Sequence, residues 1–178
     1  MNKDDAKLIS ETILHNGKWR KMVEIAIQKK LFNSDSYSPT MNIELSSCGE
    51  AIICLPYIAE TDEIILNQQF RAGVFYRGKH NPYIYELCAG TVDKNYTPLE
   101  TVKKELLEET GAEAINIELI SESYPTPGYC NELFYIFCAN VKKTSAGIFG
   151  AEGEIEDIKT TIFPASEVIA MADRGEIL

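Results

Sequence analysis

The sequence has no hydrophobic run that would cross a membrane as a helix. The longest uncharged apolar stretch, AIICLPYIA at residues 51–59, is interrupted by Pro56, whereas a membrane-spanning helix needs about 20 apolar residues. The opening MNKDDAKLIS contains two aspartates and no apolar core, so it is not typical of a signal or transit peptide. We therefore expect no membrane partner and a cytoplasmic protein.

Positive charge is also scarce. The 178 residues include 17 Lys and Arg against 27 Asp and Glu, which gives a formal net charge of -10. Proteins whose main partner is a nucleic acid or an anionic membrane carry clustered Lys and Arg, so no nucleic-acid partner is expected. An anionic substrate would need local help from a metal ion or from a few arginines.

Histidines and paired cysteine motifs are few. Because only His15 and His80 are present, a histidine-rich zinc or iron site is not expected, and any metal is predicted to be a hard cation held by oxygen. Five cysteines occur without a Cys-x-x-Cys pair, which is typical of free thiols in a reducing compartment and not of a disulfide framework. We expect these cysteines to be buried and inert.

The sequence contains mainly short strand candidates. Residues 1–47 combine alternating stretches such as KMVEIAIQ with the turn-rich FNSDSYSPT, which predicts a separate N-terminal β module. Further candidates follow in residues 48–178. The strand candidates are residues 51–58, 63–70, 82–90, 115–121, 133–141 and 159–164, and the helix candidates begin near Pro98 and Ser166. This pattern predicts an α+β domain in which helices pack against a mixed or antiparallel sheet.

The start of the first helix has a strong sequence signature. Thr97 suits the N-cap, Pro98 the first helical position, and Glu100 the capping-box position three residues after the cap. Gly111 predicts the helix end. The apolar residues at helical spacing, which we expect to face the core, are Leu99, Val102 and Leu106.

Three carboxylates gather on this helix. Glu105, Glu108 and Glu109 stand at i, i+3 and i+4, so they share one face, and each like-charge pair costs about 0.2–0.5 kcal/mol. One interpretation is a solvated acidic face without a ligand. The other is a site for Mg²⁺, which takes carboxylate and carbonyl oxygens, with the Ala89 carbonyl as a further donor and Gly90 allowing close backbone approach.

The stretch from Gly90 to Ala112 resembles a Nudix box. The box has the pattern Gly, five residues, Glu, seven residues, then Arg-Glu-aliphatic-x-Glu-Glu-x-Gly-aliphatic. The positions in register with it are Gly90, Glu105, Leu106, Glu108, Glu109 and Gly111, with Ala112 in the last slot. Two positions depart from it: Tyr96 replaces the first Glu, and Lys104 replaces the Arg, whose planar fork a lysine does not reproduce.

Beyond the box, the chain is similar to the ADP-ribose pyrophosphatase branch of the Nudix family, which also includes UDP-glucose and GDP-mannose pyrophosphatases. The similarity is carried, in this order, by ETILHNGKW, LNQQFRAG, YELCAG, SYPTPGYCNE and GAEGEIEDI. It implies the Nudix fold, a mixed β-sheet sandwiched by helices, with 48–178 as the catalytic domain. It also implies that residues 1–47 form a small β module for dimerisation and substrate base contact, so the expected partner is a second copy in a homodimer.

The reaction implied by this resemblance is hydrolysis of the diphosphate bond of a nucleoside diphosphate linked to a sugar. The first expected substrate is ADP-ribose, giving AMP and ribose 5-phosphate, because the spacing around EGEIED resembles that branch most closely. UDP-glucose and GDP-mannose are the alternatives. The implied cofactor is Mg²⁺, or Mn²⁺ in its place.

The resemblance also implies roles for individual residues. The metal ligands would be the Ala89 carbonyl, Glu105, Glu109 and Glu156, with Glu108 in support. Glu154 would be the general base, although spacing alone does not separate it from Glu152. The substrate would be bound by Arg71 at the diphosphate, by Trp19 at the base and by Glu132 nearby.

Two other classes of protein stay open. A Nudix-fold sensor that binds a nucleotide without turning it over would explain the departures at Tyr96 and Lys104. A purely structural acidic domain would show no effect of divalent ions on its melting temperature, whereas a cation at 100 times its dissociation constant adds about 2.7 kcal/mol. In such a domain Arg71 would be an ordinary charge at a sheet edge and Trp19 a core residue.

Overall fold

A computed structural model of the chain describes residues 2–17, 20–150 and 156–177. The chain forms two compact units, one made of Met1–Glu50 with Tyr124–Leu133 and the other of Ala51–Ser123 with Phe134–Leu178. The boundary expected at residue 47 falls inside the first unit. The loop Tyr124–Leu133, which belongs to the same unit, is not signalled by the sequence.

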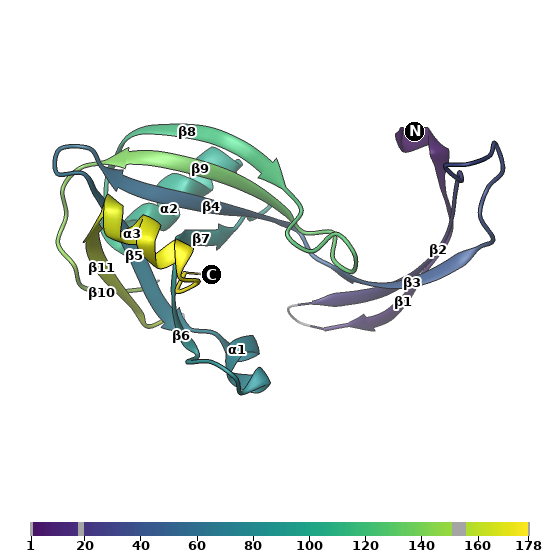
Figure 1. The fold of residues 1–178 in the computed structure, drawn as a ribbon, viewed down its shortest axis with the longest axis horizontal. Helices are drawn as coiled ribbons and strands as arrows, with labels where there is room; N and C mark the ends of the chain where they lie inside the picture. The colour runs from purple at the N-terminus through teal and green to yellow at the C-terminus, as the bar shows by residue number, and fades with distance from the viewer. Residues whose placement is uncertain (1, 18–19, 151–155, 178) are drawn as a thin grey trace. The chain divides into compact units, whose positions relative to one another are not determined.

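The first unit is a three-stranded antiparallel sheet with the order β1-β2-β3 (Figure 1). Its elements are η1 (Lys3–Asp5), β1 (Ala6–Asn16), β2 (Lys21–Lys29) and β3 (Met41–Ser47). Every residue of β1 is exposed, and among the described residues of this unit only Val23 and Cys130 are buried apolar side chains. The unit therefore has very little hydrophobic core of its own.

The second unit is built on an eight-stranded sheet. The main order is β10-β11-β5-β4-β9-β8, with β6 paired to β5 and β7 paired to β4. The strands are β4 (Glu50–Ile58), β5 (Glu63–Phe70), β6 (Tyr83–Glu86), β7 (Cys88–Thr91), β8 (Ala114–Ser123), β9 (Leu133–Val141), β10 (Ile148–Phe149) and β11 (Ile158–Pro164). All six strands expected after residue 47 are present, and the stretch expected as one strand at 82–90 is split into β6 and β7.

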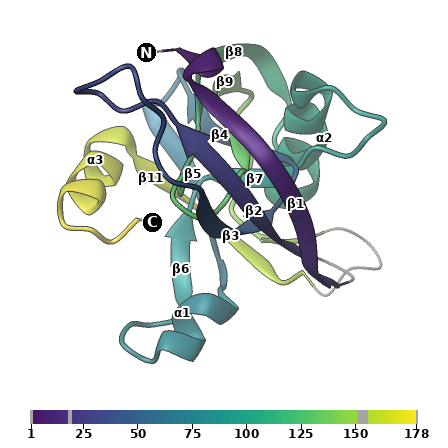
Figure 2. The same ribbon diagram turned by 90° about the vertical axis from the view of Figure 1, so that its right-hand side faces the viewer.

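Two helices cover opposite faces of this sheet (Figure 2). The α2 helix (Pro98–Thr110) packs with one buried cluster and α3 (Ala165–Asp173) with the other. Successive side chains of β5 point to opposite faces of the sheet and so contribute to both clusters. Ile65 belongs to the cluster on the α2 side, and Ile64 and Leu66 belong to the cluster on the α3 side. The expected α+β fold, a mixed sheet sandwiched by helices, is confirmed.

The structure also contains a short helix that the sequence did not predict, α1 (Ala72–Arg77), which ends at Gly78 in a left-handed conformation with φ 71°. None of the helices in the described part of the chain has the length and apolar character needed to span a membrane.

The ends of α2 follow the sequence prediction. The Thr97 side chain accepts a hydrogen bond from the Glu100 backbone N–H, and the Glu100 carboxylate accepts one from the Thr97 backbone N–H at 2.8 Å. Gly111 ends the helix at φ 63°, a left-handed conformation that favours glycine. The expected apolar stripe is only partly correct, because Val102 and Leu106 are fully buried whereas Leu99 is 43% exposed.

Candidate active site

The site is built where α2 crosses β7. Strand β7 places Gly90 directly against the Glu105 side chain: a Cβ at position 90 would lie 2.5 Å from the Glu105 carboxyl carbon and 2.6 Å from its Cγ. No side chain fits at that distance, so glycine is required for Glu105 to occupy its place. The Glu105 side chain is only 14% exposed as a result of this packing.

Glu109 lies one helical turn further along α2 and is 3% exposed. Its Oε2 accepts hydrogen bonds from the Asn67 side-chain amide at 2.9 Å and from the Ala89 backbone N–H at 3.1 Å. The pKa of Glu109 is raised to about 7, mainly by burial and also by the nearby Glu105 and Glu156 carboxylates, whereas the hydrogen bonds to Glu109 act to lower it. The interpretation of a solvated acidic face is therefore wrong at this residue, because Glu109 is held inside the protein.

Glu156 reaches the same site from the segment that precedes β11. Its charge contributes to raising the pKa values of both Glu105 and Glu109, although burial is the larger cause for each. Because electrostatic effects of this kind require proximity, the structure brings Glu105, Glu109 and Glu156 together. The Glu156 charge thus adds to the cost of ionising Glu105 and Glu109, and a bound cation would offset that cost.

Lys104 stands where the Nudix box has an arginine. Its ammonium group donates to Glu108 at 2.7 Å and to Glu105 at 3.3 Å. These contacts, the Glu108 hydrogen bond first, raise the pKa of Lys104, so it stays charged. A lysine lacks the planar fork of arginine, yet this ammonium group contacts two carboxylates at once. The departure from the box therefore preserves a cation that orients Glu105 and Glu108.

Arg71 lies at the start of α1 and pairs with a half-buried carboxylate. Its Nε–H donates to Glu86 on β6 at 2.6 Å. Burial raises the pKa of Glu86, while the Arg71 charge and hydrogen bond lower it. Arg71 is thus held against β6 by an ion pair.

The sequence did not indicate Asn67 or Glu86 as parts of the site. Asn67 is 1% exposed, and its side-chain oxygen has no hydrogen-bond partner among the described residues. The signal that could have found them is a polar residue in a mainly apolar strand: Asn67 in EIILNQQF and Glu86 in PYIYELCAG. A polar side chain buried in a sheet normally has a hydrogen-bond partner.

The structure does not place the remaining predicted residues relative to α2. Glu132 belongs to the first unit, where it lies beside Cys48 and Cys130. Trp19 and Glu154, together with the alternative base Glu152, lie outside the described residues. Their roles remain predictions.

Comparison with known proteins defines the class of protein to which this site belongs. Residues 49–177 match the model of the NUDIX domain, and the chain belongs to the Nudix family. It is a hydrolase of pyrophosphate bonds.

Particular relatives are nucleotide-sugar enzymes. The chain is 33% identical over 134 residues to the GDP-mannose pyrophosphatase of Pectobacterium atrosepticum, covering 75% of this chain and 69% of that protein. It is 32% identical to the GDP-mannose pyrophosphatase of Citrobacter koseri, covering 75% and 70%. A crystal structure of an ADP compounds hydrolase matches with a TM-score of 0.71 over 95% of this chain and 83% of that one. At 16% sequence identity, this last similarity supports the fold alone.

Nudix pyrophosphatases generally need a divalent metal ion, and the residues present fit one. All the donors gathered here are oxygens, which suits a hard cation. Two of the carboxylates are largely buried, at 3% exposure for Glu109 and 14% for the Glu105 side chain. Their charges repel one another in a low-dielectric setting, and the ion pair that Lys104 makes with Glu105 neutralises only one of them. A divalent ion would satisfy this charge.

Proposed function

We propose that the chain hydrolyses the phosphoanhydride bond of a nucleoside diphosphate linked to a sugar, using Mg²⁺ or, in its place, Mn²⁺. The observation that carries this proposal is the convergence of Glu105, Glu109 and Glu156 beside Gly90 in a Nudix box. Water adds across the P–O–P linkage, so one phosphorus gains a hydroxyl group and the bridging oxygen leaves with the other. The products are a nucleoside monophosphate and a sugar phosphate.

Glu105, Glu109, Glu156 and the Ala89 carbonyl are the groups that would hold the cation. When bound, the cation supplies electrostatic stabilisation of the charge that develops on the diphosphate oxygens. The chain fixes these ligands in advance: Asn67 and the Ala89 N–H hold Glu109, and Gly90 leaves space for Glu105. Lys104 orients Glu105 and, with Glu108, completes the charge balance of the helix.

Arg71 is assigned to the diphosphate. The ion pair with Glu86 engages its Nε–H, while the terminal amino groups of the guanidinium carry its other donors. A forked, permanently charged donor is suited to two neighbouring phosphate oxygens. Glu154 is assigned to water activation, with Trp19 and Glu132 as contacts to the rest of the substrate, and these three assignments rest on the family resemblance.

GDP-mannose becomes the first substrate to test, because the curated relatives at 32–33% identity are named GDP-mannose pyrophosphatases. ADP-ribose, the first expectation from the sequence, is the second. Initial rates on GDP-mannose, ADP-ribose and UDP-glucose, with Mg²⁺ and with product identification by phosphorus NMR, decide between them. Binding of all three without any turnover would instead establish the nucleotide sensor.

A homodimer through the first unit is part of the proposal. Strand β1 forms an edge of its sheet, and its apolar residues are 49–63% exposed, namely Leu8, Ile9, Ile13 and Leu14. An exposed apolar edge strand favours pairing with another chain. Light scattering at micromolar concentration is expected to give twice the chain mass of 19.9 kDa. A monomer under these conditions would contradict the dimer, and Ile13→Lys is expected to produce one.

A further inference from the structure

The first unit contains a second cluster of ligand-type side chains, separate from the carboxylates of α2. Cys48, Cys130 and Glu132 each offer a ligand atom, and these atoms all lie within 4.8 Å of one another. Cys48 follows β3, whereas Cys130 and Glu132 come from the loop Tyr124–Leu133. This loop and β3 are far apart in sequence, so the fold brings the three groups together.

We propose that Cys48, Cys130 and Glu132 form a binding site for a thiophilic divalent cation of the Zn²⁺ class. The distance between the two sulfurs is the first argument. Cys130 Sγ lies 3.6 Å from Cys48 Sγ, and two thiolates at about 2.3 Å from a tetrahedral Zn²⁺ stand about 3.8 Å apart. The sulfurs are therefore already at the spacing of one edge of a zinc coordination tetrahedron.

Groups able to donate a hydrogen bond to each sulfur are the second argument. The Glu132 backbone N–H donates to Cys130 Sγ at 3.4 Å, and Ser46 Oγ lies 3.3 Å from Cys48 Sγ. Donors of this kind support the negative charge of a metal-bound thiolate and fix its direction.

The backbone around the cluster is held in place by its own hydrogen bonds. The Cys48 N–H donates to the Asn131 side-chain oxygen at 2.7 Å, and the Ser46 N–H donates to the Tyr129 carbonyl at 2.8 Å. Cys130 is buried, while Cys48 and Glu132 are partly accessible. The site is thus pre-formed and still open to a cation from solvent, with three protein donors and room in the coordination number for water.

The weak core of the first unit supplies a reason for such a site. Only Val23 and Cys130 are buried apolar side chains among its described residues, and small units with little core are commonly stabilised by a metal or by disulfides. A cation held by Cys48, Cys130 and Glu132 would tie the loop Tyr124–Leu133 to the end of β3. Mg²⁺ would not compete, because it prefers oxygen to thiolate ligands.

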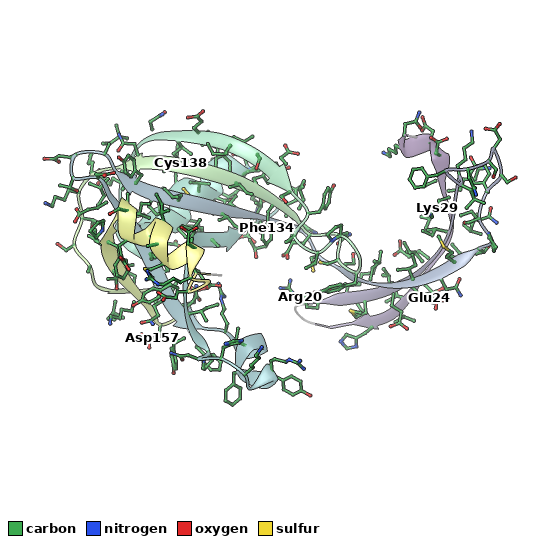
Figure 3. The ribbon with its side chains drawn as sticks, in the orientation of Figure 1. Arg20, Glu24, Lys29, Phe134, Cys138 and Asp157 are labelled. Atoms are coloured by element: carbon green, nitrogen blue, oxygen red, sulfur yellow. The ribbon has the colours of Figure 1, made fainter. Side chains whose placement is uncertain are left out.

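The test titrates Co²⁺, and then Zn²⁺, into reduced protein in saturating Mg²⁺, which occupies the α2 carboxylates. The expected result is a cobalt–thiolate charge-transfer band that Zn²⁺ abolishes by displacement. Cys48→Ser and Cys130→Ser are expected to weaken Zn²⁺ binding by at least about a hundredfold, and Ser46→Ala by about tenfold, since loss of an outer-shell partner costs roughly 10–100-fold. Cys138→Ser is the matched control on β9 in the second unit (Figure 3) and is expected to bind as wild type.

A measurement on the wild-type chain keeps the test independent of variant folding. Zn²⁺ is expected to protect Cys48 and Cys130 from alkylation, mapped by mass spectrometry, and to leave the labelling of Cys138 unchanged. The absence of the cobalt band, or a band that survives both Cys48→Ser and Cys130→Ser, would overturn the proposal. So would reduced protein that binds no Zn²⁺ but loses two thiols to a Cys48–Cys130 disulfide on treatment with peroxide.

Discussion

Replacing Glu109 by glutamine should stabilise the metal-free protein at alkaline pH while destroying its response to Mg²⁺. Glu109 is 3% exposed and its pKa is raised to about 7 from an ordinary value of 4.5. A raised pKa means that the folded state binds the proton more tightly than the unfolded state. The stability from this group is therefore fully present below pH 4.5 and is lost as pH rises through 7.

The size of the effect follows from the two pKa values. At about 1.4 kcal/mol for each pH unit between 4.5 and 7, ionising Glu109 in the folded protein costs about 3 kcal/mol at pH 8. Glu109→Gln removes this ionisation, and the amide oxygen can still accept from Asn67 and from the Ala89 N–H. For a chain of this length, about 3 kcal/mol corresponds to roughly 6–12 °C in melting temperature.

The assay is chemical denaturation of wild type and Glu109→Gln between pH 4.5 and 8, first in a chelator and then in saturating Mg²⁺. In the chelator, the free energy of unfolding should fall with pH in wild type and stay flatter in the variant. In Mg²⁺, wild type should regain stability and the variant should not. Glu100→Gln is the matched control, because Glu100 serves the capping box. This variant should keep both the fall of stability with pH and the gain of stability in Mg²⁺.

Two outcomes would refute this reasoning. If the Glu109 carboxylate were a favourable ion-pair partner, Glu109→Gln would lose stability, so a variant less stable than wild type at pH 8 in chelator contradicts the burial argument. If Mg²⁺ raised the free energy of unfolding equally in both proteins, Glu109 would not hold the cation.

Three further predictions concern the same site. Gly90→Ala should lower turnover at least about tenfold and leave the circular-dichroism spectrum normal. The new Cβ would lie 2.5 Å from the Glu105 carboxyl carbon, and losing a ligand's support costs roughly 10–100-fold in metal affinity. An unchanged Mg²⁺ dependence of the rate would disprove this prediction. Lys104→Arg should keep or modestly raise kcat, since arginine also contacts carboxylates, and a large loss would give Lys104 a role of its own. Glu154→Gln should lower kcat by ~10²–10⁴ with little change in substrate affinity, whereas Glu152→Gln should not, and the reverse result would move the base two residues earlier.

The sequence predicted those features of the fold that depend on local chemistry. The capping box of Thr97 and Glu100, the end of α2 at Gly111 and the strand at residues 63–70 all follow from neighbours within a few residues. Leu99 was misjudged because helical spacing does not say how wide the contact with the sheet is, and that contact leaves Leu99 exposed.

The sequence predicted the grouping of the carboxylates on α2 but not the burial of Glu109. The spacing of the glutamates places them on one helix face, yet the burial of Glu109 depends on Asn67 and Ala89 from other strands, which no local pattern contains. The ion pair between Arg71 and Glu86 and the cluster around Cys130 likewise join distant segments. Contacts of this kind follow from strand order, which the sequence alone did not specify.

The most direct test of the central claim is the initial rate of nucleotide-sugar hydrolysis as a function of Mg²⁺, measured for wild type and Glu105→Gln side by side. Wild type should release nucleoside monophosphate and sugar phosphate in equal amounts with a saturable Mg²⁺ dependence. Glu105→Gln should fold normally and be slower by at least about a hundredfold, since even outer-shell losses at metal sites cost roughly 10–100-fold. A wild-type protein without turnover in Mg²⁺ or Mn²⁺, or a Glu105→Gln variant with the wild-type rate, would contradict the assignment of catalysis to the α2 carboxylates.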